Sequence, residues 1–164
     1  MALTRPDSEI LQLLKERRIA SLATRNADDS VHMTAVWFLY ENDCYYVATS
    51  STARKARNAA ARPQVSIMLD VRREAKEWGV TAAGTAQLIT GEPVRQIVHR
   101  IHERYMSAAA IADPQVGPVF AALDDVVLEL RPTSWLKWKT ADLDNAMFGG
   151  KLCGTPGYLL PLAE

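Results

Sequence analysis

The sequence predicts a mainly β fold with flanking helices, in which the strands form an antiparallel barrel. Short runs rich in β-branched and aromatic residues recur along most of the chain, and turn-forming residues separate them. The first three runs are joined by connections that are too short for the crossover between parallel strands. These observations favour an antiparallel barrel over a doubly wound parallel sheet.

Each element is expected from its own local pattern. Apolar residues at helical spacing predict helices at residues 7–16 and 92–106, and a short basic helix is expected near residues 54–58. The first three strands are expected to form a meander. Gly84 interrupts the fifth strand, where a missing side chain indicates a bulge or a close approach by another group. The six predicted strands lie at residues 18–24, 31–40, 43–49, 63–71, 78–90 and 126–131, and the last can continue to residue 138.

Length and composition limit the function classes. The chain of 164 residues fits one domain, which we place at residues 1–140, followed by an extended C-terminal extension at residues 141–164. Nineteen basic and nineteen acidic residues cancel, so no nucleic-acid or membrane partner is expected. No segment resembles a signal peptide or a membrane span, which predicts a cytoplasmic protein.

The sequence offers little support for a bound metal. Cys44 and Cys153 match no metal or redox spacing. His99 and His102 lie three residues apart on the long helix, but on a charged flank where solvated side chains are commoner than metal ligands. We therefore expect no metal site.

The strand that ends at residue 49 runs directly into a hydroxyl-rich turn and a basic helix start. Thr49 and Ser50 begin a run of four hydroxyl side chains, and Arg54 and Lys55 follow shortly after. Free N–H groups at a helix start, hydroxyl groups and fixed cations all attract a phosphate dianion. The same residues also fit a hydroxyl-rich N-cap before a solvated basic helix, so the residues alone leave both interpretations open.

A family resemblance favours the first interpretation. The chain carries RIASLAT at residues 18–24, VWF at 36–38, RKARN at 54–58 with PQVSI at 63–67, and a strand from Val80 to Ala86. In this order and spacing, these segments resemble the pyridoxamine 5′-phosphate oxidase-like superfamily from about residue 8 to about residue 138. The resemblance implies a six-stranded antiparallel split β-barrel and a homodimer with two cofactor sites at its interface. Both FMN and the deazaflavin F420 occur in such proteins, and this sequence does not separate them.

The resemblance also implies roles for particular residues. The strand at residues 34–37 would offer backbone groups to the tricyclic ring. Thr49 and the pair Arg54 and Lys55 would hold the cofactor phosphate, and Gly84 would let the ring lie flat. Trp37 and Trp135 have a structural alternative as core side chains, and Asn58 has one as the residue that ends its helix. The expected cofactor-binding residues are Thr34, Val36, Trp37, Thr49, Ser50, Arg54, Lys55, Asn58, Gly84 and Trp135.

These features predict an oxidoreductase that uses FMN or F420 to transfer a hydride to or from an unidentified small-molecule substrate. The cofactor carries that chemistry, so no residue is assigned as catalytic. The segment after Arg131 shows no counterpart of the substrate-phosphate arginine of true pyridoxamine-phosphate oxidases, so vitamin B6 oxidation is not expected.

Three other functions compete with this prediction. A flavin-binding carrier or sensor would bind the cofactor without turnover. A nucleic-acid-binding barrel could use Arg54, Lys55 and Arg57, but the zero net charge argues against it. Heme binding, known in relatives, lacks a His or Cys placed near the expected groove.

Overall fold

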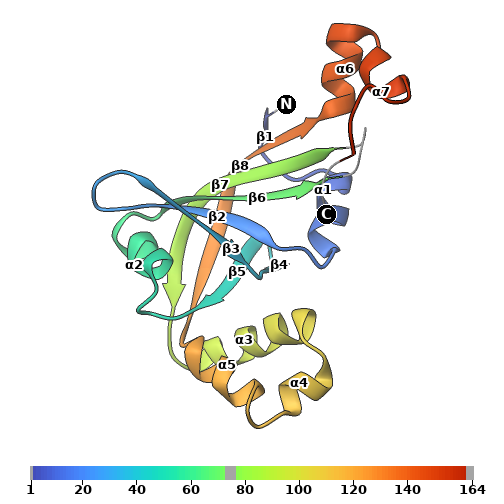
Figure 1. Ribbon diagram of the computed structural model, residues 1–164. Helices are drawn as coiled ribbons and strands as arrows, with labels where there is room; N and C mark the ends of the chain where they lie inside the picture. Colours follow the sequence, from blue (N-terminus) through green and yellow to red (C-terminus); the bar gives the residue numbers. More distant parts are fainter. Residues whose placement is uncertain (1, 73–76, 162–164) are drawn as a thin grey trace.

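The sheet is continuous and antiparallel, and it curls into a half-barrel (Figure 1). The computed structural model describes residues 2–72 and 77–161. Seven strands follow the order β3-β2-β6-β7-β8-β5-β4, and the short β1 pairs with β8. The strands are β1 Ala2–Leu3, β2 Ala20–Arg25, β3 Val31–Val36, β4 Leu39–Glu41, β5 Cys44–Thr49, β6 Gln64–Val71, β7 Trp78–Ile89 and β8 Val126–Lys139.

The prediction of six strands was wrong, because one expected strand is two and the short β1 was not expected. The run at residues 31–40 divides into β3 and β4, which pair with β2 and β5 at opposite edges of the sheet. At the break, the Tyr105 hydroxyl accepts a hydrogen bond from the Phe38 N–H at 3.3 Å and lies 3.4 Å from the Phe38 carbonyl oxygen. The Tyr105 hydroxyl thus contacts the backbone groups of Phe38 that a neighbouring strand would otherwise bind. The expected meander is replaced by two hairpins.

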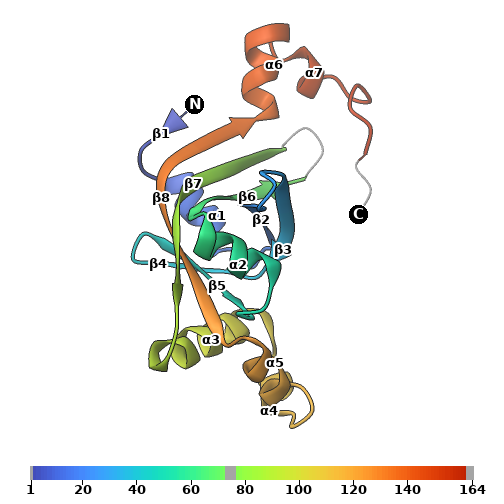
Figure 2. The same ribbon diagram turned by 90° about the vertical axis from the view of Figure 1, so that its left-hand side faces the viewer.

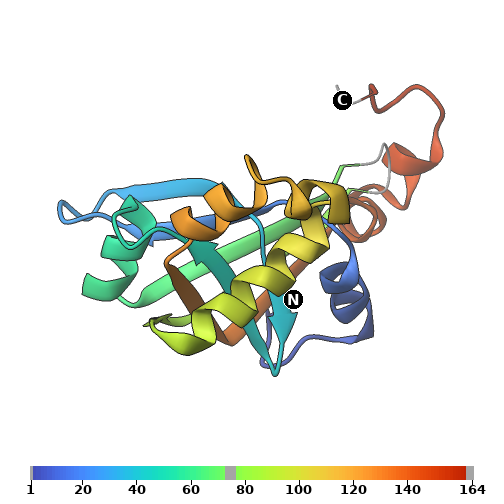
Figure 3. The same ribbon diagram turned by 90° about the horizontal axis from the view of Figure 1, so that it is seen from below.

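Helices α3, α4 and α5 lie at one end of the sheet and α6 and α7 at the other, while α1 and α2 lie between the two ends (Figures 1 and 2). Seen from below, α3 crosses the lower end with α4 and α5 beside it (Figure 3), while α6 and α7 project beyond the opposite end. No helix within residues 2–72 and 77–161 is long and apolar enough to cross a membrane. The helices are α1 Ser8–Lys15, α2 Arg54–Ala61, α3 Glu92–Tyr105, α4 Ala108–Ala112, α5 Gly117–Leu123, α6 Thr140–Phe148 and α7 Lys151–Gly154.

The main core lies inside the curl of the sheet. Alternate residues of β6 are buried, as the period of two along a strand requires. The apolar stripe of α1 adds Ile10, Leu13 and Leu14, each at most 2% exposed. A smaller cluster, formed by Val94, Val98 and Val127, seats α3 against the sheet.

Part of the C-terminal extension is helical rather than extended, since it forms α6 and α7. Buried Asp144 in α6 accepts hydrogen bonds from the backbone N–H groups of Leu152 at 2.8 Å and Cys153 at 2.7 Å. One carboxylate therefore fixes α7 against α6. The glycine and proline content of this segment does not indicate this contact.

Gly84 marks a β-bulge, as its position predicted. The register between β7 and β8 shifts between Ala83 and Gly84. A Cβ atom at Gly84 would lie 2.0 Å from the Arg131 carbonyl oxygen, far inside contact distance. Only a residue without a side chain lets the two backbones approach here.

We expect Gly84→Ala to lower the free energy of unfolding by about 2–3 kcal/mol, because the new methyl group must displace backbone. Gly154→Ala is the matched control, since its Cβ would meet nothing within 4 Å and Gly154 has no positive φ. The control is expected to change stability by less than about 0.5 kcal/mol. Urea unfolding of both variants measures the difference, and equal stabilities would contradict the close approach.

Salt bridges attach α1 to the far end of β8. Asp7 caps α1 by accepting from the Ile10 N–H at 2.9 Å, and it also binds Lys137. Glu9 accepts from Lys137 at 2.9 Å and from Lys139 at 2.7 Å. The hydrogen bond from Lys137, and then that from the Ile10 N–H, holds the pKa of Asp7 below its ordinary value.

This lowered pKa makes α1 attachment acid-sensitive. A carboxylate with a lowered folded-state pKa stabilises the fold fully above its unfolded pKa of about 4, and this contribution is lost as the pH falls through the folded pKa. We expect Asp7→Asn to be less stable than wild type at pH 7 and the difference to shrink towards pH 3. Thermal unfolding at both pH values measures this, and a difference independent of pH would refute it.

A second substitution separates the cap from the ion pair. Asn caps helices about as well as Asp, whereas Asp7→Ala also loses the cap and should cost about 1 kcal/mol more than Asp7→Asn. That increment should persist at pH 3, since it does not depend on charge.

Candidate functional site

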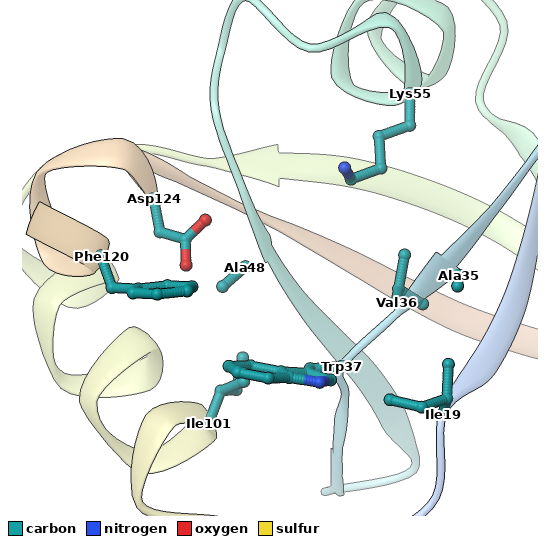
Figure 4. Close-up of a pocket in the computed structure, with 9 residues that line it drawn as sticks. All are labelled: Ile19, Ala35, Val36, Trp37, Ala48, Lys55, Ile101, Phe120 and Asp124. Carbon is teal, nitrogen blue, oxygen red and sulfur yellow. The ribbon is translucent and has the colours of Figure 1, made fainter. Parts of the chain in front are cut away.

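A cavity of about 270 Å³ opens where β3, β5, α2, α3 and α5 meet (Figure 4). Most of its lining is apolar, with one cation and one carboxylate. The lining residues are Ile19, Ala35, Val36, Trp37, Ala48, Lys55, Ile101, Phe120 and Asp124.

An aromatic stack forms one wall of the cavity. The ring of Trp37 lies parallel to that of Tyr105, with 5.0 Å between centroids and 1° between planes. Phe120 of α5 lies 5.9 Å from Trp37 at 12°. The Tyr105 hydroxyl also donates to the Arg18 carbonyl oxygen at 2.7 Å, which ties α3 to the chain before β2. The wall is therefore flat and held from several sides, as suits a planar ligand.

Lys55 supplies the positive side of the cavity. Its side chain reaches from the first turn of α2 into the opening (Figure 4). The N-cap residue Ala53 forms no side-chain cap, so the helix start keeps free N–H groups. Within the described residues, no hydrogen bond or ion pair joins Lys55 or the exposed Arg54 to another side chain. The Lys55 ammonium group and the uncapped helix start together favour an anion here.

Some polar groups of the hydroxyl-rich turn before α2 already form hydrogen bonds within the protein. Asp125 accepts from the backbone N–H and from the hydroxyl of Ser51, both at 2.6 Å. The bond from the Ser51 hydroxyl, and then that from its N–H, lowers the pKa of Asp125. Ser50 bonds Thr52 within the turn at 2.9 Å. Sequence reasoning missed Asp125, because 74 residues separate it from Ser51.

Thr49 is the last residue of β5 before this turn, and it does not line the cavity. It is 2% exposed, and its hydroxyl has no hydrogen-bond partner among the described residues. Its neighbour Ala48 lines the cavity instead, because successive residues of a strand face opposite sides.

A buried histidine holds the carboxylate on the other side of the cavity. Asp124, just after α5, accepts from His102 Nε2 through its Oδ2 atom at 3.0 Å. His102 is only 4% exposed, so the expectation of a solvated side chain was wrong. The two residues also line a second cavity of about 340 Å³ among α3, α4 and α5. The pair of His102 and Asp124 could not be predicted from a local sequence pattern, because its members lie 22 positions apart.

Two other predicted site residues serve the fold. The side chain of Asn58 donates to Thr24 Oγ1 at 3.1 Å and to Asn26 Oδ1 at 2.9 Å, which ties α2 to the β2–β3 hairpin. Asn58 does not end its helix either, since α2 continues to Ala61. Trp135 is 2% exposed inside the barrel, 5.8 Å from the Tyr45 ring, so the alternative of a core side chain is correct for it.

The remaining predicted residues do not all meet in one place, and neither Thr34 nor Arg54 lines a cavity that other predicted residues line. Val36, Trp37 and Lys55 meet at the cavity described above. Gly84 lines a different hollow of about 380 Å³, and Thr34 is half-buried on β3 without lining either. The structure thus brings Val36, Trp37 and Lys55 together, but not all ten predicted residues.

Comparison with known proteins identifies the family. Residues 6–139 match the family model described as pyridoxamine 5′-phosphate oxidase. The curated protein Heme oxygenase HutZ of Vibrio cholerae is 28% identical over 137 residues, which are 80% of this chain and 75% of HutZ. The crystal structure of HutZ, described as a heme storage protein, has a TM-score of 0.61 at 25% identity and covers 81% of this chain and 95% of its own.

Two further solved structures share the fold. The conserved hypothetical protein Rv2991 of Mycobacterium tuberculosis has a TM-score of 0.69 at 20% identity, covering 98% of this chain and 93% of its own. An F420 reductase has a TM-score of 0.60 at 22% identity, covering 80% and 98%. With the family model matching most of its length, the chain belongs to the pyridoxamine 5′-phosphate oxidase family.

Proposed function

We propose that the cavity binds a phosphate-bearing planar cofactor, FMN or F420, and that the protein is an oxidoreductase acting on a small organic substrate. The observation that carries the proposal is the placement of Lys55 and the uncapped start of α2 beside the flat wall of Trp37. A bound flavin or deazaflavin would supply the hydride chemistry. The chain would hold the phosphate, orient the ring and exclude water.

The size of the cavity supports a site shared between two subunits. Its volume of about 270 Å³ is below the range of about 300–1,000 Å³ that is usual for ligand pockets. One protomer would therefore enclose only part of the cofactor, and a second copy would complete the site.

The edge strand β3 offers a surface for that second copy. Val31 and Met33 on β3 are 66% and 61% exposed, and Ile19 just before β2 is 53% exposed. An unpaired strand edge with exposed apolar side chains is a surface that proteins usually cover. The proposed function therefore includes a homodimer that is formed through this surface.

The substrate is proposed to differ from pyridoxamine 5′-phosphate. No arginine follows Arg131 in the sequence, so β8 beyond this point and the helices α6 and α7 offer no guanidinium group for a substrate phosphate. A carrier or sensor that binds the same cofactor without turnover is the alternative within this site.

Heme is a second candidate ligand because the relative HutZ is named for it. The cavity lining contains no histidine or cysteine to serve as an axial ligand. His102 lies close by, but its Nε2 atom is bonded to Asp124. The basic helix start therefore favours a phosphate cofactor over heme.

We expect FMN to bind the wild-type protein, and Arg54→Ala/Lys55→Ala to weaken that binding about tenfold or more, as loss of charge-assisted hydrogen bonds does. Riboflavin lacks the phosphate, so its affinity should be the same for both proteins. The control Lys15→Ala/Arg17→Ala removes two exposed cations near the end of α1 and should leave FMN binding unchanged. Fluorescence titration with FMN, riboflavin and F420 measures all of these affinities.

The same titration decides between the candidates. Tighter binding of FMN or F420 identifies the cofactor, and equal effects of the double substitution on FMN and riboflavin would refute the phosphate site. Hemin binding with a Soret shift, in the absence of flavin binding, would favour heme.

The dimer has its own test. We expect Met33→Asp to convert a dimer into a monomer, because a charge would be buried at the interface without a partner. Met147→Asp on α6 is the control, since Met147 is similarly exposed at 66%. Light scattering after size-exclusion chromatography measures the mass, and a monomeric wild type would contradict the shared site.

A further inference from the structure

The cavity carries opposite charges on opposite sides. Lys55 reaches in from α2, while the Asp124 carboxylate faces it from the end of α5 (Figure 4). The two groups form no salt bridge with each other, although both line the same space. A ligand lying between them would meet a cation at one end and an anion at the other.

The Asp124 carboxylate is held in place by a buried group that does not itself line the cavity. His102 occupies Oδ2 with a hydrogen bond of 3.0 Å, and its own side chain is 95% buried. The His102 ring packs edge-on against Phe120 at 5.7 Å and Trp37 at 6.5 Å, so its orientation is set by the aromatic wall. Oδ1 keeps its lone pairs for another donor.

We propose that Asp124, positioned by His102, determines the ligand specificity of this cavity. It would select flat ligands that present an N–H donor or a positive group to Asp124, and it would reject those that present an anion. This inference rests on the proposed function in one respect, since the anionic end of the same ligand would lie at Lys55. The imide N–H of a flavin or deazaflavin ring is a donor of the required kind.

Two flat dyes of opposite charge test this selectivity without a flavin. Proflavine is a cation with amino donors, and anthracene-9-carboxylate is an anion without donors. We expect Asp124→Asn to weaken proflavine binding about tenfold, as for one hydrogen bond to a charged group, and to strengthen binding of the carboxylate dye. Asp142→Asn, at an exposed aspartate of α6, is the control and should leave the ratio of the two affinities unchanged.

His102 is tested as a positioning residue through the same ratio. His102→Phe keeps an aromatic ring against Phe120 but loses the donor, so it should shift the dye ratio towards that of Asp124→Asn. His102→Gln keeps an N–H donor and should restore most of the wild-type ratio. If the role of His102 were purely structural, both variants would be less stable. The ratio of the two dye affinities would then not differ between them.

The outcomes separate this inference from the proposed function. If neither FMN nor F420 binds but the dye ratio follows Asp124, the proposed cofactor fails and the specificity role stands. If a flavin binds through Arg54 and Lys55 but the ratio ignores Asp124, the function stands and this inference is overturned. Failure of proflavine to bind the wild-type protein would also overturn it.

Discussion

The hydroxyl group of Tyr105 anchors the part of the chain on which the rest of the structure depends. It donates to the Arg18 carbonyl oxygen before β2 and accepts from the Phe38 N–H after β3. These bonds hold α3 against the point where the chain leaves one edge of the sheet for the other. Three features depend on this point of the chain. They are the open half-barrel, the stacking of Trp37 on Tyr105 and the cavity beside Trp37.

The charges around the cavity are arranged in space rather than in sequence. The cations belong to α2, directly after β5, whereas both Asp124 and Asp125 come from the segment between α5 and β8. Asp125 bonds the turn before α2, and Asp124 faces the cavity. One short acidic segment thus supports the turn and supplies the anionic side of the cavity.

The family relationship gives the fold but not the ligand. Relatives named for heme and for F420 share this half-barrel, so the same backbone supports unrelated chemistry. A shared backbone leaves the choice of ligand to side chains. Here these are one lysine, one aspartate and a flat aromatic wall, without a histidine or cysteine among the lining residues.

The sequence by itself determined what depends on local pattern. Alternation along β6, the helical period of α3, the basic start of α2 and the bulge at Gly84 all follow from neighbouring residues. The tertiary structure decided what depends on distant partners. The break at Phe38 needs Tyr105, which is 67 positions away, and the burial of Trp135 needs the β5 side chain Tyr45.

The candidate site divides in the same way. The basic, uncapped start of α2 could be predicted because its cations and its N–H groups are consecutive in the chain. The contacts of Asn58 with Asn26 and of Asp124 with His102 could not, since each joins elements that only folding brings together. Local periodicity fixes which face of an element is apolar, whereas the position of a polar partner depends on how the elements pack.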